Sequence, residues 1–214
     1  MSGTRAISRG IRPVHGDIQR FGSFEEVSSC TRWVHNNEQT EIPTVVDGTS
    51  SDSYDKTYRL DGLGRGSKVE ITTNTGHHLS TDVPQKMGGT DTAPQPVETL
   101  LAAWMGCTQA TALFVGRQMS PRIIIESLVF EGIEAVRDER GALALPIEET
   151  PSVPSRLRRI SGRIRVSTRA RTKMSNEEIE LLKEQTEIRC PIANMIIASG
   201  CAIDVEWTDV TITQ

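Results

Sequence analysis

The stretch GGTDTAPQPVETLLAAWMGC, residues 88–107, decides how this chain folds. Two glycines and two prolines come first, and an apolar run follows them. Proline and a carboxylate are both favoured in the first turn of a helix, so Pro96 and Glu98 mark a helix start, and Pro121 marks its end. The pattern predicts a helix over residues 97–119. Because apolar residues cover nearly its whole circumference, we expect burial on every side.

Shorter patterned segments surround this helix. Residues 68–73 and 78–82 alternate in polarity on either side of an Asn-Thr-Gly turn, which predicts a β-hairpin. Further strands are predicted over 123–136 (broken by Gly132), 159–172 and 202–212, further helices over 175–186 and 190–198, and a charged loop over 138–158. This order favours an α+β fold in which helices cover one side of an antiparallel sheet.

The first part of the chain has a different character. Residues 1–55 are rich in small polar and charged residues and show no sustained period, so we interpret them as an N-terminal extension, partly irregular, with a short strand possible over residues 31–35. Residues 56–214 form the predicted domain.

The composition of the chain makes some classes of function less favoured than others. The net charge is −4 and both signs are mixed along the chain, which argues against nucleic-acid binding. No uninterrupted apolar run is long enough for a membrane span or a signal peptide, so we expect a cytoplasmic protein. The Arg-rich opening is equally compatible with a plain tail and with a mitochondrial presequence, which makes mitochondria the alternative compartment.

The four cysteines suggest thiols rather than structural disulfides, and none forms a Cys-x-x-Cys pair. Cys107 inside an apolar helix is explained by core packing, because buried cysteine behaves as a small hydrophobe. Cys190 stands directly before Pro191, at a helix start whose free N–H groups favour a thiolate. Cys201 is most simply a core residue, and Cys30 an incidental thiol of the extension.

Two segments together carry a resemblance to a known family. The Gly88-Gly89 pair with PQPVETLLAAWMGCT (residues 94–108), and CPIAN (residues 190–194), resemble the two signatures of the OsmC/Ohr proteins, the osmotically inducible and organic-hydroperoxide-resistance proteins, and are closer to the broad OsmC-like branch. The resemblance covers roughly residues 58–214.

The resemblance implies a thiol-dependent peroxidase that acts on organic hydroperoxides, built as an intertwined homodimer without a cofactor or metal. Cys107 would attack the hydroperoxide and become a sulfenic acid, and Cys190 would condense with it to a disulfide. A dithiol reductant, often lipoyl-linked in this family, would reset the pair.

Two further site residues follow from the resemblance. Burial raises a thiol pKa, so Cys107 needs a cation nearby, and Arg65 stands where the family places its arginine; a solvated loop arginine is the other reading. The carboxylate that orients the arginine lies ten residues before the cysteine in the hydroperoxide branch, whereas Glu98 lies nine before Cys107. At 100° per residue, Glu98 would face nearly away from Cys107, and it is also explained as a helix-start acid.

An alternative function therefore stands beside the peroxidase: an OsmC-like dimeric binding protein for a hydrophobic ligand or partner. Other features have simple explanations. We interpret His77-His78 as an exposed hairpin tip rather than a metal site. We interpret Trp104 as a packing residue rather than a substrate contact. A run of five arginines is interpreted as a solvated strand face, with an anionic partner or substrate as the alternative: Arg156, Arg158, Arg159, Arg163 and Arg165.

Overall fold

The computed structural model describes residues 54–169 and 173–210. The elements along the chain are β1 (Leu60–Arg65), β2 (Lys68–Thr73), β3 (His78–Thr81), the 3-10 turn η1 (Gln85–Met87), α1 (Pro96–Gln118), β4 (Ile125–Arg137), α2 (Arg140–Leu143), β5 (Leu157–Thr168), α3 (Asn176–Arg189), α4 (Pro191–Ala198) and β6 (Ala202–Asp209). The α+β class is confirmed, and the predicted elements appear in the predicted order with ends displaced by a few residues. β1, η1 and the short α2 were not predicted.

The predictions for the N-terminal extension lie outside the described residues. They concern the extension itself over residues 1–55, the strand over residues 31–35, the presequence and the incidental thiol of Cys30. The boundary between extension and domain stays a prediction.

The strands form two three-stranded sheets, in the orders β1-β2-β3 and β4-β5-β6. The first sheet is antiparallel throughout, and its second hairpin is the predicted one. In the second sheet β4 and β5 are antiparallel, with a bulge at Gly132, whose φ is 56°. β5 and β6 are parallel, so the prediction of an antiparallel sheet is wrong at this edge. The reason is the connection between the two strands. Helices α3 and α4 carry the chain back to the end of the sheet where β5 begins, so that β6 runs in the same direction as β5.

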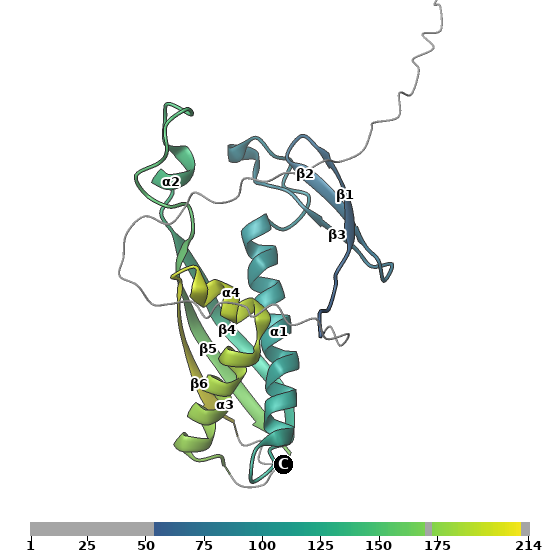
Figure 1. Cartoon of the computed structure of the whole chain (residues 1–214), viewed down its shortest axis with the longest axis vertical. Coiled ribbons are helices and arrows are strands. Elements are labelled where there is room, and N and C mark those ends of the chain that lie inside the picture. Colours follow the sequence, from purple (N-terminus) through teal and green to yellow (C-terminus); the bar gives the residue numbers. More distant parts are fainter. Residues whose placement is uncertain (1–53, 170–172, 211–214) are drawn as a thin grey trace, which may run out of the picture. The chain divides into compact units, whose positions relative to one another are not determined.

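The three longer helices cover one face of the β4–β6 sheet (Figure 1). The core lies between them and the sheet, and its most completely buried large side chains include Trp104 of α1, Ile160, Ile164 and Val166 of β5, Leu182 of α3 and Val205 of β6. Among the described residues, α1 is long and apolar enough by composition to cross a membrane. One stripe of α1 is buried in this core, so its apolar composition is explained by core packing.

Helix α1 is well defined at its start but is not buried all round. Gln95 caps it, and Glu98 accepts a hydrogen bond from the Gln95 backbone N–H at 2.8 Å. The residues that the chain buries form one stripe at spacings of three and four: Trp104, Thr108, Ala112, Val115 and Gly116. On another face Phe114 is 56% exposed. The prediction of burial on every side is therefore wrong for the single chain, because α3, α4 and the sheet cover only one side.

The Gly88-Gly89 pair of the family signature has a steric explanation. Gly88 has φ of 84°, in the left-handed region that favours glycine, and it ends η1. At Gly89 an added Cβ would lie only 1.8 Å from the carbonyl oxygen of Val83. The loop that leads into α1 therefore needs a bare backbone at this point.

Replacing Gly89 with alanine is expected to destabilise the protein by about 1–3 kcal/mol, since the Val83 backbone must move to accept the methyl group. Gly64→Ala is the matched control, because its Cβ would meet Val69 at 3.8 Å, an ordinary contact. Urea unfolding of both variants measures the difference. Equal midpoints would contradict the close approach at Gly89.

Candidate functional site

The two signature cysteines meet between α1 and α4. Cys107 is half-buried near the middle of α1, and Cys190 is fully buried as the residue that caps the start of α4. The Cys190 thiol lies close enough to Cys107 for the two groups to interact, and both thiols are free. The fold thus brings together two cysteines that are far apart in the sequence.

The environment of Cys190 keeps it protonated. Burial, and then the interaction with the neighbouring Cys107, raise the pKa of the Cys190 thiol above the ordinary range. Its sulfur also accepts a hydrogen bond from the Ala193 N–H at 3.4 Å, which acts in the opposite direction. The sequence predicted that the helix start would favour a thiolate here, but burial outweighs that effect.

Cys107 lies at the border of the exposed face of α1. Leu100, Cys107 and Phe114 follow at intervals of seven residues, so they fall within about 20° of one line along the helix. Leu100 and Phe114 are both substantially exposed, and an added Cβ at Gly106 would meet no atom within 4 Å. One side of Cys107 therefore contacts the core, and the other faces an uncovered apolar surface.

The other two predicted site residues are not joined to this pair within the chain. Arg65 is the last residue of β1, next to the turn at Gly66, and it is exposed. Its side chain makes no hydrogen bond or ion pair with a described residue. Glu98 is exposed and accepts the hydrogen bond of the helix cap. The helix-start role of Glu98 is thus observed, and the catalytic roles of both residues stay predictions.

A buried carboxylate that the sequence analysis did not single out organises the loop before α1. Asp82 is completely buried, and its oxygens accept hydrogen bonds from the Ser67, Thr90 and Thr92 hydroxyls and from the Val83, Thr90 and Thr92 N–H groups. The Ser67 hydroxyl bond, at 2.6 Å, and then the Thr90 bond hold the pKa of Asp82 far below its usual range. An acid at a strand end, followed by Thr-x-Thr, is the only signal for this arrangement in the sequence.

The depressed pKa of Asp82 predicts a loss of stability in acid. A carboxyl group with a lower pKa in the folded state stabilises the fold above its unfolded pKa of about 4, and this contribution is lost as the pH falls below that value. We expect the free energy of unfolding to fall between pH 5 and pH 2 by less in Asp82→Asn than in the wild type. Asp91→Asn, which changes an exposed acid, is the control and should follow the wild type.

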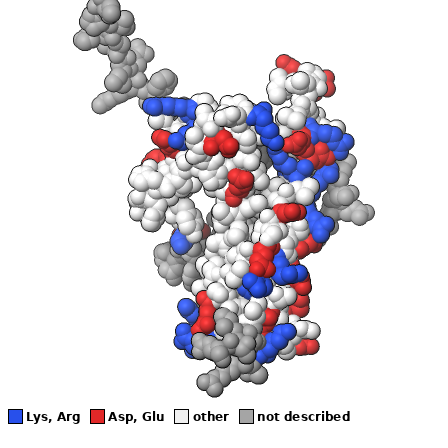
Figure 2. Space-filling view, turned by 180° about the vertical axis from the view of Figure 1, so that it is seen from behind, with Lys and Arg blue, Asp and Glu red and all other residues white. Residues whose placement is uncertain are grey.

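Most of the arginine run is neutralised by ion pairs. The four pairs, with their N–O distances, are Arg158–Asp138 (2.7 Å), Arg159–Asp204 (2.9 Å), Arg163–Glu206 (3.0 Å) and Arg165–Glu131 (2.7 Å). Figure 2 shows basic and acidic side chains intermixed on the face that it displays. Arg156 differs, since it has no carboxylate partner among the described residues.

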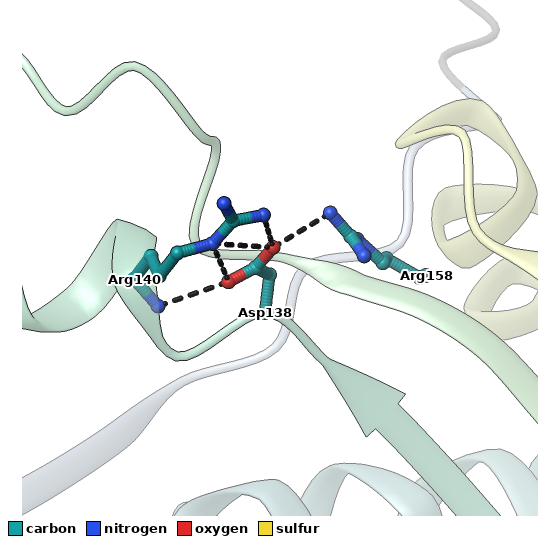
Figure 3. Close-up of polar contacts among 3 residues, drawn as sticks. All are labelled: Asp138, Arg140 and Arg158. Carbon is teal, nitrogen blue, oxygen red and sulfur yellow. Dashed lines mark hydrogen bonds and ion pairs between the residues drawn. The ribbon is translucent and has the colours of Figure 1, made fainter.

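Asp138 joins the end of β4 to the start of β5. Its carboxylate lies between the guanidinium groups of Arg140 and Arg158 (Figure 3), and the shortest contact with Arg140 measures 2.6 Å. Hydrogen bonds from the Arg140 side chain are the main reason that the pKa of Asp138 lies well below its usual range. The pairing holds this end of the β4–β5 hairpin together.

Metal chemistry has no candidate site in the part of the chain that the structure describes, where no group of three or more His, Cys, Asp or Glu is placed to hold an ion. His77 and His78 lie at the exposed β2–β3 turn, and His78 Nδ1 hydrogen-bonds the Thr72 hydroxyl at 3.0 Å. The thiol pair is therefore the principal candidate for chemistry.

The fold and the thiol pair define a class: α+β proteins in which a central helix and the start of a second helix bring two free cysteines together. A family model described as OsmC-like protein matches residues 89–206, more than half of the 214-residue chain. The chain belongs to the OsmC-like protein family. The resemblance to OsmC/Ohr proteins is thereby confirmed.

Solved structures agree with this assignment. An OsmC-like protein from Mycoplasma pneumoniae is 21% identical, with a TM-score of 0.54, and the match covers 73% of this chain and 99% of that one. An OsmC-like protein of unknown function from Vibrio cholerae is 11% identical, with a TM-score of 0.55 and coverage of 73% and 100%. An organic hydroperoxide resistance protein OsmC from Legionella pneumophila is 15% identical, with a TM-score of 0.51 and coverage of 72% and 97%. At these identities the likenesses show the fold alone. A comparison with curated proteins found no match.

Proposed function

We propose that the protein is a thiol-dependent peroxidase that reduces organic hydroperoxides through Cys107 and Cys190. The observation that carries this proposal is that the fold brings two free thiols, one half-buried and the other fully buried, close enough to interact. Membership of the OsmC-like family and the likeness to a protein described as an organic hydroperoxide resistance protein support it.

The reaction needs one nucleophile and one resolving thiol. The Cys107 thiolate attacks a peroxide oxygen, the O–O bond breaks, and the alcohol leaves with a proton while Cys107 becomes a sulfenic acid. Cys190 then attacks the sulfenic sulfur, so that a disulfide forms and water leaves. A dithiol, such as a lipoyl group, reduces the disulfide by exchange and is itself oxidised. The raised pKa of Cys190 leaves the first attack to Cys107, because a protonated thiol is a poor nucleophile, and Cys190 must lose its proton before the second step.

The proposal includes a homodimer. The uncovered face of α1 combines the exposed side chain of Phe114 with the small residues Ala103, Gly106 and Ala110, which let another backbone approach closely. A second copy of the chain would cover this face and the open side of Cys107. Arg65 makes no contact with Cys107 in its own chain, so the partner's Arg65 would supply the cation that Cys107 requires.

The dimer gives a direct prediction. Phe114→Asp should convert a species of twice the chain mass into a monomer, because it places a carboxylate in the apolar contact. Leu145→Asp is the control, since Leu145 is 82% exposed on the loop before β5. Sedimentation velocity at several protein concentrations measures both. A wild-type monomer at every concentration would contradict the interface.

One observation favours the alternative, a dimeric binding protein for a hydrophobic ligand without peroxidase activity. Glu98 is engaged in the helix cap and lies nine residues before Cys107, on nearly the opposite face of α1. It therefore does not stand where the hydroperoxide branch has its arginine-orienting acid.

The two functions are separated by titrating free thiols before and after one equivalent of cumene hydroperoxide. The peroxidase loses two thiols per chain within the mixing time of a stopped-flow instrument, and mass spectrometry of the product finds a Cys107–Cys190 link. If the thiols react no faster than an ordinary exposed thiol, the binding function replaces the peroxidase. The cytoplasm as the compartment is part of the proposal.

A further inference from the structure

A second site lies away from the thiol pair. A cavity of about 260 Å³ opens where the first turns of α1, the far end of α4 and the β4–β5 ends meet. Its apolar wall consists of Val97, Leu100, Leu157 and Ile196, and neither Cys107 nor Cys190 lines it. At about 30 Å³ per water-sized group, the volume matches on the order of nine non-hydrogen atoms. The cavity is therefore sized for a small molecule.

Arg156 supplies a positive charge at this cavity, and its guanidinium group has a defined position. An added Cβ on Gly200 would lie 2.6 Å from Arg156 Nη1, so the guanidinium packs directly over the bare glycine. Gly200 has φ of 81° and follows α4, where the left-handed conformation favours glycine. The residue that ends the helix thus also makes room for the cation.

The guanidinium group of Arg156 forms no ion pair with another described residue. The four other arginines of its run pair with carboxylates, whereas Arg156 pairs with none among the residues that the structure describes. No Asp or Glu of the described part of the chain lines the cavity. Arg137, a second lining residue, is only loosely paired, at 4.0 Å from Glu139. Two guanidinium groups beside an apolar wall favour the binding of an anion that also carries an apolar group.

The frame of the cavity is held in place by neighbouring contacts. Asp138 directly follows Arg137, and its ion pair with Arg158, the residue after Leu157, closes the hairpin end on which both lining residues stand (Figure 3). Cys201, which is 3% exposed, also lines the cavity. Burial raises the pKa of the Cys201 thiol, and the charge of Arg156 opposes this only in part. Cys201 therefore stays neutral and does not compete for the guanidinium.

We propose that this cavity binds a small monocarboxylate with a short apolar tail. The carboxylate bonds to Arg156, with Arg137 beside it, because the planar guanidinium fork matches the two oxygens of a carboxylate. The tail lies among Val97, Leu100, Leu157 and Ile196. The site does not depend on the proposed peroxidase reaction.

Calorimetric titration of the full chain with hexanoate, and separately with hexanol, tests the proposal. We expect saturable hexanoate binding with a Kd on the order of 1 mM, and binding of hexanol that is weaker by about tenfold, because hexanol lacks the charge. Arg156→Gln should weaken hexanoate binding by about tenfold. Arg163→Gln, an arginine of the same run whose partner is Glu206, should leave it unchanged.

Two further measurements fix the location. Val97→Trp should fill the cavity and abolish binding, and Cys107→Ser should bind hexanoate like the wild type, so a failed peroxidase reaction leaves this result intact. In a chain with Cys30, Cys107 and Cys190 changed to serine, hexanoate should slow the reaction of Cys201 with methyl methanethiosulfonate. No hexanoate binding at 20 mM, equal binding of hexanol, or equal binding by the Arg156→Gln variant would each overturn the proposal.

Discussion

Replacing Cys107 with serine is expected to lower the rate of cumene hydroperoxide reduction by at least about 10³-fold, because the hydroxyl does not ionise at neutral pH and the attacking thiolate is gone. The measurement is stopped-flow loss of hydroperoxide with dithiothreitol as the reductant. The fold should be unchanged, since Cys107 is only half-buried and serine has nearly the same shape.

Cys190→Ser is the matched variant, and it should behave differently. Cys107 can still attack, so the first turnover should proceed and leave a sulfenic acid that a dimedone probe captures at Cys107. Cys201→Ser is the control and should keep full activity, because Cys201 lies at the separate cavity. Equal rates for the Cys107 and Cys190 variants would contradict the two roles.

The second large effect concerns stability. Trp104→Ala is expected to lower the free energy of unfolding by about 3–5 kcal/mol, through lost burial and the cavity that remains. Trp104 is 2% exposed, and its ring meets Phe130 of β4 edge to face, with 6.1 Å between ring centroids. It is the largest side chain that ties α1 to the sheet.

Urea unfolding at one fixed protein concentration measures this loss, since the stability of a dimer depends on concentration. Tyr58→Ala serves as the control, because Tyr58 is 70% exposed and its removal should change the free energy by less than about 0.5 kcal/mol. A loss below about 1 kcal/mol at Trp104 would mean that α1 is not anchored by this ring.

Local signals in the sequence were sufficient to predict the helices and most of the strands. Pro96 and Glu98 mark the start of α1, and Ser175 caps α3 with the reciprocal bond from Glu178. Gly132 predicted a break in β4 and occupies its bulge. Each of these features depends on neighbours within a few residues, which the sequence shows directly.

Features that depend on distant partners were missed or misjudged. Alternation in 202–212 does not say which strand β6 joins, so its parallel pairing with β5 went unrecognised. The apolar surface of α1 predicted burial correctly for Trp104 but not for Phe114, since pattern alone does not say how much of a helix one chain covers. Asp82 was not identified, and Arg156 was interpreted together with the other arginines of its run, because the contacts that distinguish both residues come from segments far away along the chain.

For the candidate site, the sequence predicted the meeting of Cys107 and Cys190 only through the family signatures. Neither apolar periodicity nor helix capping brings two helices together at a chosen pair of residues. The structure supplies that contact, and with it the raised pKa of Cys190. The roles of Arg65 and Glu98 remain predictions, because Arg65 makes no contact with the pair in its own chain.

The arrangement around Asp82 has a dynamic consequence. The Asp82 carboxylate accepts hydrogen bonds from the turn at Ser67 and from the loop at Thr90 and Thr92. Opening either segment alone would therefore leave a charged group without some of its hydrogen-bond donors. The two segments should therefore open as one cooperative unit. Hydrogen exchange of their amide protons should therefore give one common free energy of opening for both segments.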